Sequence, residues 1–281
     1  ENSYRFTARF QLIDQVSNNP LYMKQWLEDV SADVMREQPN GANSALKVAL
    51  RELRGTDLYP EGMYTPREAC HMEHRAVFSS GPFTMEFEQL LDGLYRALVC
   101  ATALREVALA KLTPEEVEWL QNNPGYYIVP DGKRMPPLTG DNTSHLRYIE
   151  LIRKVSFKHI FYASEIVANA VTYFVNHASK LERMEIFSAA ATSIMSFNTP
   201  LGRVLVLDSG NDEFRGPAAL VVDLGGDDLY SGPLATSLGK SGAGICIDLG
   251  GNDTYKGGSY LQGFGFLGTG CLVDVSGNDK Y

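Results

Sequence analysis

Positive charge is scarce in this chain, and long apolar runs are missing. The 281 residues hold 25 Lys and Arg against 34 Asp and Glu, which gives a net charge of −9. Binding to nucleic acid or to an anionic membrane surface needs clustered cations, so we expect neither partner. No stretch reaches the ~18 consecutive apolar residues of a membrane-spanning helix, and we expect no transmembrane segment.

The chain also lacks the motifs of the common catalytic and metal sites. Its four cysteines form no CxxC or CxxCH pair, which excludes the usual zinc, redox and covalent-haem sites and allows disulfides without requiring any. There is no GxSxG, HExxH or P-loop, and no GxGxxG that opens a helix. His71 and His74 have a spacing that can share a metal on a helix, but no second cluster supplies further ligands. We interpret this pair as structural or surface residues.

Glycine is rare until residue 200 and abundant afterwards. Eighteen of the 26 glycines lie in residues 201–281, whereas all five histidines and both tryptophans lie before them. We therefore predict an α+β protein with two domains. Residues 1–200 form a mainly helical domain, and residues 201–281 form a C-terminal parallel β-solenoid.

Helical periodicity dominates the first part of the chain. Apolar residues at spacings of three and four predict helices within 19–35, 83–110 and 143–181, the last as one helix or two in succession. Thr113 and Glu116 have the spacing of a capping box at the start of another helix. Residues 4–10 alternate like a strand, and the prolines and glycines of 122–142 indicate a long loop.

The second part repeats an acidic, glycine-rich phrase. "DSGNDEF", "DLGGDDLY", "DLGGNDTY" and "DVSGNDKY" open at Asp208, Asp223, Asp248 and Asp274, and an apolar strand segment precedes each. Their Gly-Asn/Asp-Asp steps are 16, 25 and 26 residues apart. A period in the mid-twenties predicts one solenoid coil per repeat, with Asp223, Asp248 and Asp274 in register in a parallel sheet.

The phrase "GGNDTYKGG" (250–258) resembles the nonapeptide of RTX proteins, whose parallel β-roll binds Ca²⁺ in its turns. The copies here are not in tandem, and an aromatic residue takes the place usually held by Leu, so a wider coil fits better than a β-roll. The resemblance implies an extracytoplasmic, calcium-dependent fold. The chain begins with Glu1 rather than Met, which we interpret as processing or trimming that has removed any signal peptide.

Stacked coils would bring aspartates of the same charge to about 4.8 Å from one another, so their repulsion must be offset. Ca²⁺ could do this with carboxylate and carbonyl oxygens. Alternatively, each Asp accepts hydrogen bonds from N–H groups of its own turn, and Asn252 and Asn278 stack as an amide ladder. Both explanations stay open. The candidate calcium ligands are Asp223, Asp228, Asp248, Asp253, Asp274 and Asp279.

Two functions remain open at this point. The preferred one is a non-enzymatic, exported structural or protein-interaction scaffold, because acids that recur in every coil do not make a unique catalytic pair. The alternative is a carbohydrate-active β-helix enzyme, a polysaccharide lyase or hydrolase. A non-repeating acid pair beside a base such as Lys240 or Lys256 would favour the enzyme.

The strand segments also predict their surroundings. Residues 220–222 and 245–247 are apolar at every position, so both faces of their sheet should be buried, with helices from 83–200 as the cover. Cys246 and Cys271 lie one register position apart and should point to opposite faces without forming a disulfide. At Tyr281 we expect an open solenoid edge that continues into further residues, pairs with a protein partner or self-assembles.

Overall fold

The computed structural model describes residues 78, 81–123, 143–181, 186–187, 195–237, 241–257 and 262–281, together with Glu28 and Ala32. The chain divides into two compact units, 1–65 and 66–281, and the architecture described below belongs to the second. The predicted strand at 4–10 and the His71–His74 pair lie outside the described residues. The same holds for the predicted helix within 19–35, except that Glu28 and Ala32 are helical.

Four described helices precede the strands: α5 (Met85–Leu109), α6 (Pro114–Asn122), α7 (Thr143–Ile152) and α8 (Phe157–Ala178). The predicted capping box is confirmed at α6, where Thr113 and Glu116 each accept a hydrogen bond from the other's backbone N–H. The segment 143–181 forms two helices because the chain tightens into i to i−3 bonds at Lys154 and Val155. None of the helices in the described part of the chain has the length and apolar composition needed to cross a membrane.

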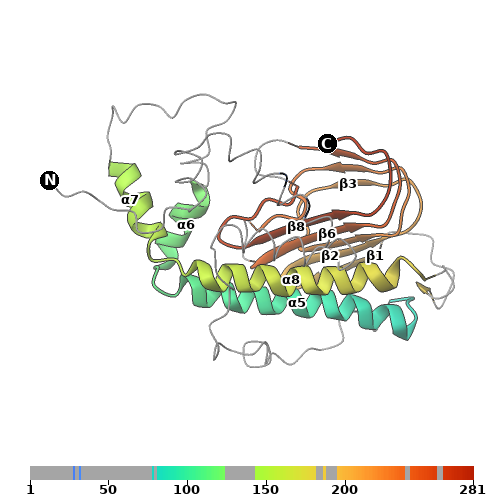
Figure 1. Ribbon diagram of the computed structural model, residues 1–281, viewed down its shortest axis with the longest axis horizontal. Helices are drawn as coiled ribbons and strands as arrows, with labels where there is room; N and C mark the ends of the chain where they lie inside the picture. Colours follow the sequence, from blue (N-terminus) through green and yellow to red (C-terminus); the bar gives the residue numbers. More distant parts are fainter. Residues whose placement is uncertain are drawn as a thin grey trace. The chain divides into compact units, whose positions relative to one another are not determined.

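The second part of the chain alternates between two sheets (Figure 1). The larger sheet has the order β1-β2-β4-β6-β8, with β1 antiparallel to β2 and the other neighbours parallel. The smaller sheet is parallel, with the order β3-β5-β7. The strands are β1 (Met195–Thr199), β2 (Gly202–Leu207), β3 (Glu213–Arg215), β4 (Leu220–Asp223), β5 (Leu229–Ser231), β6 (Ala243–Asp248), β7 (Thr254–Lys256) and β8 (Thr269–Asp274).

The predicted register of the repeats is confirmed. Asp223 pairs with Asp248, and Asp248 pairs with Asp274, in consecutive parallel strands. Strand residues that are equivalent in successive repeats therefore lie side by side, and every acidic phrase from Asp223 onward follows the same path from the larger to the smaller sheet.

At the central strands β4 and β6 both faces of the larger sheet are buried, as the continuous apolar runs predicted. One face packs against α5 and α8, which run along it in Figure 1. The opposite face packs against aromatic residues of the smaller sheet. The alternate side chains on the helix-covered face are Val204, Val206, Leu220, Val222, Ile245 and Ile247. Those on the other face are Leu205, Leu207, Val221 and Cys246.

Helices α5 and α8 and the larger sheet thus share one hydrophobic core within residues 66–281. The domain boundary predicted at residue 200 stays a prediction, although the change from helices to strands does fall close to it.

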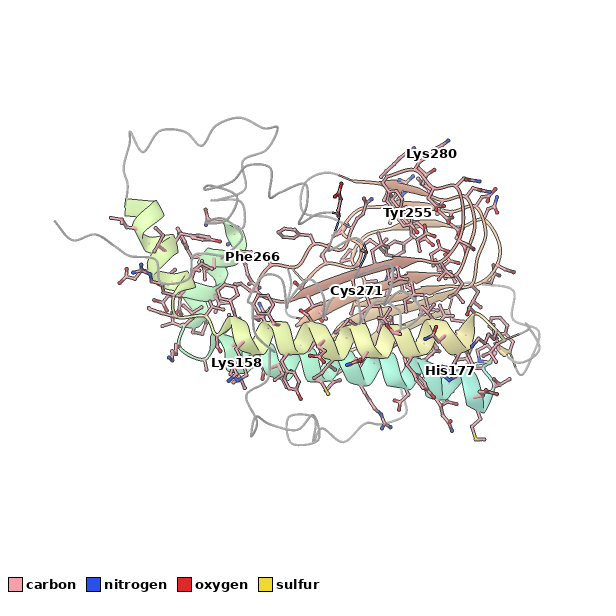
Figure 2. The ribbon with its side chains drawn as sticks, viewed as in Figure 1. Lys158, His177, Tyr255, Phe266, Cys271 and Lys280 are labelled. Atoms are coloured by element: carbon pink, nitrogen blue, oxygen red, sulfur yellow. The ribbon has the colours of Figure 1, made fainter. Side chains whose placement is uncertain are left out.

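The cysteines of the sheet are both free thiols, so the predicted absence of a Cys246–Cys271 disulfide is confirmed. The register sets Cys271 beside Ile245 and Cys246 beside Leu272. Cys246 packs between the two sheets, whereas Cys271 packs toward the helices. Figure 2 shows Cys271 and Tyr255 within the stack of strands and Lys158 and His177 toward opposite ends of α8.

Candidate metal centre

The four acidic phrases form turns that carry the chain from the larger to the smaller sheet. We call these segments the acidic turns: turn 1 (208–212), turn 2 (223–228), turn 3 (248–253) and turn 4 (274–279). Turns 2 to 4 each contain two aspartates of interest. The first is the last residue of a strand of the larger sheet, and the second is the last residue of the turn. We refer to the first as strand-end aspartates (Asp223, Asp248, Asp274). We refer to the second, together with Asp212 at the end of turn 1, as turn-end aspartates (Asp212, Asp228, Asp253, Asp279).

The strand-end aspartates begin their own turns. Asp223 Oδ1 accepts a hydrogen bond from the N–H of Gly225 at 3.1 Å, and Asp248 Oδ1 accepts one from Gly250 at 2.9 Å. Gly225 has a φ of 121°, a backbone conformation that glycine favours. These are Asx turns, so the hydrogen bonds of the metal-free explanation are present.

A column of tyrosines meets the other oxygen of each strand-end aspartate. Tyr230, Tyr255 and Tyr281 stack in parallel, with centroids 4.8 Å apart in each successive pair. The Tyr230 hydroxyl lies 2.6 Å from Asp223 Oδ2 and 2.7 Å from Asp248 Oδ2. A phenol has only one proton to donate, so the second of these short contacts needs a proton on a carboxyl group. In agreement, burial raises the pKa of Asp223 to about 9.

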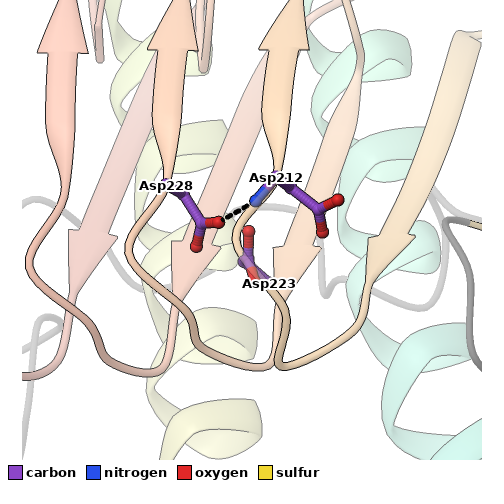
Figure 3. Close-up of side chains that lie close together, drawn as sticks. All are labelled: Asp212, Asp223 and Asp228. Atoms are coloured by element: carbon purple, nitrogen blue, oxygen red, sulfur yellow. Dashed lines mark hydrogen bonds between the residues drawn. The ribbon is translucent and has the colours of Figure 1, made fainter.

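The turn-end aspartates join successive turns. Oδ1 of Asp228 accepts a hydrogen bond from the N–H of Asp212 at 2.5 Å, which Figure 3 shows as a dashed line. Asp253 Oδ1 accepts in the same way from Asp228 N–H at 2.7 Å, and Asp279 Oδ1 from Asp253 N–H at 2.9 Å. Each of these carboxylates therefore binds the backbone of the preceding turn rather than of its own.

The second oxygen of three turn-end aspartates is buried without a hydrogen-bond partner. This holds for Oδ2 of Asp212, Asp228 and Asp253. Asp228 is only 3% exposed and Asp253 only 1%. Burial raises the pKa of Asp228 to about 6 and that of Asp253 to about 7, and the nearby Asp248 raises both further. Burying a carboxylate oxygen without a hydrogen-bond donor costs free energy, so a bound proton or a cation would stabilise these atoms.

The aspartates gather into three clusters in which one carboxylate oxygen of each residue lies within 4.8 Å of the others. Each cluster combines the turn-end aspartate of one turn with both aspartates of the next. Figure 3 shows the first cluster, where Asp223 lies below Asp212 and Asp228. The clusters are Asp212, Asp223 and Asp228; Asp228, Asp248 and Asp253; and Asp253, Asp274 and Asp279.

This donor set can hold a metal ion. All of its side-chain ligands are carboxylate oxygens, which suit hard divalent cations such as Ca²⁺ and Mg²⁺ rather than Zn²⁺. None of the ion pairs found among the described residues involves these aspartates. The unpartnered Oδ2 atoms of Asp228 and Asp253 supply ligands that the fold leaves free.

All six residues proposed from the sequence as calcium ligands belong to these clusters. Sequence reasoning missed Asp212, although the alignment of Gly210 with Gly226 places Asp212 opposite Asp228. Turn 1 is one residue shorter between its aspartates than the others, so Leu207 rather than Asp208 is in register with Asp223. Asp208 belongs to no cluster among the described residues and instead accepts a hydrogen bond from Gly210 N–H at 2.7 Å.

A third, exposed column reinforces the stack. Asp227 N–H donates to Asn211 Oδ1, Asn252 N–H donates to Asp227 Oδ1, and Asn278 N–H donates to Asn252 Oδ1, at 2.8 to 3.1 Å. The amide ladder expected from Asn252 and Asn278 thus exists as side-chain to backbone bonds.

Comparison with protein-family models, with curated proteins and with solved structures finds no match to this chain. Its function is therefore inferred from the site itself.

Proposed function

We propose that this chain is a non-enzymatic, exported structural or protein-interaction scaffold whose repeats form a β-solenoid stabilised by Ca²⁺. The observation that carries the proposal is the repetition of one acid cluster at three successive steps of the stack. A catalytic pair is a single constellation, whereas these aspartates recur with the same partners in each turn. Uniform repetition is typical of a structural element.

The two parallel ladders support the solenoid. The chain passes from β4 to β5, on to β6 and then to β7, so it alternates between the sheets and advances one strand in each. Thr254 and Lys280 continue the smaller ladder by a parallel bridge after β8. Successive repeats would be successive coils, with the tyrosines between the sheets.

Calcium is supported by the chemistry of the clusters. Each cluster brings together three carboxylates, and carboxylate oxygens are the ligands that a hard cation such as Ca²⁺ prefers. The resemblance of the turn phrase to RTX repeats agrees with this choice. The cation would satisfy the buried Oδ2 atoms of Asp228 and Asp253.

Export is supported by the oxidation state of Cys100, which is disulfide-bonded. Disulfides persist in oxidising compartments and are rare in the cytosol. The partner in our proposal is a protein or a second copy that docks on β8. This strand ends the order of the larger sheet, and Tyr281 beyond it is 75% exposed.

A thermal unfolding scan of the full chain tests the proposal. We expect the melting temperature to rise when chelator is replaced by millimolar Ca²⁺. At a free concentration 100 times the Kd, one site contributes about 2.7 kcal/mol, or a shift of about 5–10 °C for a unit of this size. Superimposable curves would leave only the Asx turns and tyrosine contacts to stabilise the stack.

The carbohydrate-active enzyme remains a second candidate because of one non-repeating pocket. It has a volume of about 280 Å³ and lies between β2 and β3, where Asp212, Glu213, Arg203 and Arg215 line it. Arg215 forms an ion pair with Glu213. Lys240 lies outside the described residues, and Lys256 is exposed at the end of β7. Cleavage of an acidic polysaccharide that is lost in Glu213→Gln, with the calcium response kept, would favour this candidate.

A further inference from the structure

The larger sheet extends one strand further than the smaller sheet at the end of the stack where the repeats begin. Strands β2, β4 and β6 are each followed in the chain by a strand of the smaller sheet, which are β3, β5 and β7. The antiparallel strand β1 has no such counterpart, so β3 is the outermost strand of the smaller sheet among the described residues. Ser196 of β1 pairs with Leu205, whose side chain faces the smaller sheet, yet Ser196 is exposed. No described strand therefore covers this face of β1.

The backbone of β3 presents hydrogen-bonding groups along its outer edge. The carbonyl of Asp212 accepts a hydrogen bond from the N–H of Leu229, so the peptide groups of even-numbered residues face β5. In a parallel ladder the intervening residues face the other way, which directs the N–H and C=O of Glu213 and Arg215 away from β5. The Arg215 carbonyl receives a weak bond of 3.4 Å from a guanidinium nitrogen of Arg203. This edge can accept another strand.

A pocket of about 280 Å³ lies at this edge and is lined by residues of β1, β2 and β3. Its apolar part belongs to the core between the sheets and is formed by Leu205, Leu207 and Phe214. In the next repeat, Tyr230 from the middle of β5 fills the space between the sheets and lies in register with Phe214. A strand added beside β3 would place its own central side chain in the pocket in the same way.

Two charged side chains of the pocket have a buried atom without a hydrogen-bond partner. Nε of Arg203 is an unused donor, and Oδ2 of Asp212 is an unused acceptor. Figure 3 shows the Asp212 carboxylate pointing away from Asp228, which begins the neighbouring strand β5. A peptide group complements both atoms, because its C=O can accept from Arg203 and its N–H can donate to Asp212. The side chains and the edge backbone thus match the same kind of ligand.

We propose that the edge of β3 binds an extended peptide segment of a partner protein as an additional strand of the smaller sheet, with an apolar side chain of the peptide in the pocket. The inference rests on the proposed protein-interaction function and names a docking site and a kind of partner for it. The site differs from docking at β8, since it lies at the opposite end of the stack and extends the other sheet. Strand addition combines main-chain hydrogen bonds, which supply affinity, with a side-chain pocket, which supplies selectivity.

The same residues favour a peptide over a sugar chain. The guanidinium carbon of Arg203 lies 5.5 Å from the centroid of the Phe214 ring, so this face of the ring is covered and cannot stack on a sugar. Glu213 is already paired with Arg215. The alternation of N–H and C=O groups along β3 matches the repeat of a peptide backbone.

Variants at residue 215 isolate the backbone contact. Arg215→Pro removes the outward N–H and blocks the addition of a strand, whereas the ladder to β5 does not use this N–H. Arg215→Ala is the matched control, because it loses the same side chain and the same ion pair but keeps the N–H. Ser196→Trp fills the pocket from an exposed position on β1 and tests the side-chain contact separately.

The probe is a phage-displayed library of random octapeptides, selected on the full chain, followed by fluorescence anisotropy with an enriched peptide. We expect enriched peptides to carry apolar residues at alternate positions. Arg215→Pro and Ser196→Trp should each weaken the Kd by about tenfold or more, and Arg215→Ala should leave it close to that of the original chain.

N-methylation of the peptide gives a second readout. Methyl groups on one set of alternate amides should abolish binding, and methyl groups on the other set should not, because only one side of the peptide faces β3. Circular dichroism checks that each variant is folded, and Ser196→Trp keeps the test decisive if the proline variant is not.

The outcomes separate the β3 site from the function on which it rests. No enrichment of peptides, or binding that Arg215→Pro and Ser196→Trp both leave unchanged, would overturn the β3 site. Binding of an acidic oligosaccharide that Ser196→Trp abolishes, without binding of peptides, would overturn it in favour of the enzyme. The calcium-dependent melting curve tests the scaffold independently, so the scaffold can stand while the β3 site fails.

Discussion

Replacing Gly226 by Ala should strongly destabilise the stack, because a methyl group there would meet the backbone of the preceding turn. An ideal Cβ on Gly226 lies 2.0 Å from the carbonyl oxygen of Gly210 and 2.7 Å from its carbonyl carbon. Normal contacts of this kind are well above 3.0 Å, so turns 1 and 2 would have to separate by about 1 Å. Such a movement opens the Asp212 N–H to Asp228 Oδ1 bond and the Leu229 N–H to Asp212 carbonyl bond, which measure 2.5 and 2.9 Å.

Two terms set the size of the effect. The φ of Gly226 is 134°, and a residue with a Cβ pays about 1–3 kcal/mol in that region. The two weakened hydrogen bonds add about 0.5–1.5 kcal/mol each. We expect Gly226→Ala to lower the free energy of unfolding by about 2–6 kcal/mol, measured by urea denaturation in chelator.

Gly216→Ala is the matched control for backbone strain. Gly216 has a φ of 100°, but nothing lies within 4 Å of the position that the alanine methyl group would take, so this variant should show the strain term alone. The change in unfolded-chain entropy from Gly to Ala is common to both variants and cancels in their difference. Equal losses of stability in the two variants would refute the close stacking of turns 1 and 2.

Three further predictions follow from the same structure. Gly93 is exposed within α5 with open space at its Cβ position, so Gly93→Ala should stabilise the protein by about 0.5–1 kcal/mol in the same denaturation assay. Cys246 is fully buried and its thiol pKa is raised by burial, so a maleimide should label it only after denaturation. Folded-state pKa values raised to about 9 at Asp223 and about 6 at Asp228 mean that the folded state holds protons more tightly than the unfolded state. In chelator, the melting temperature should therefore fall as the pH rises from about 4 to about 9, and a rise over that range would contradict the burial of these carboxyls.

The register of the sheet could be predicted because the repeated phrase ends each strand in the same way. In a parallel stack, equivalent residues of successive repeats are neighbours, so Asp223, Asp248 and Asp274 had to meet once the repeats were recognised. The cover of helices could also be predicted, since a strand such as 220–222 that is apolar at every position must be buried on both faces.

The short strands β3, β5 and β7 could not be assigned in the same way, because three residues carry too little periodicity. Their common feature is a single aromatic residue in the middle of the strand, at Phe214, Tyr230 and Tyr255. The different register of turn 1 could not be predicted either. Turn 1 has one residue fewer between its aspartates, which moves Asp208 out of register with Asp223, although its sequence still resembles the other acidic phrases.

The role of the tyrosines was likewise missed, although the sequence carries a signal for it. Each tyrosine lies seven residues after a strand-end aspartate, from Asp223 to Tyr230, Asp248 to Tyr255 and Asp274 to Tyr281. The structure shows that this spacing brings each phenol to the carboxylate of its own turn. The aromatic residue at this position is therefore a hydrogen-bond donor as well as an apolar filler between the sheets.

This distinction separates the two aspartate columns by how their charge is offset. In the strand-end column, Asp223 and Asp248 have donors for both oxygens, from glycine N–H groups on one side and tyrosine hydroxyls on the other. Oδ2 of Asp274 accepts from tyrosine hydroxyls in the same way. The turn-end column receives only one backbone N–H per carboxylate, and Oδ2 of Asp228 and Asp253 is left without a donor. The protein alone can thus stabilise the first column, through hydrogen bonds and retained protons. The second column is the one whose buried Oδ2 atoms have no donor, so a retained proton or a bound cation would stabilise it.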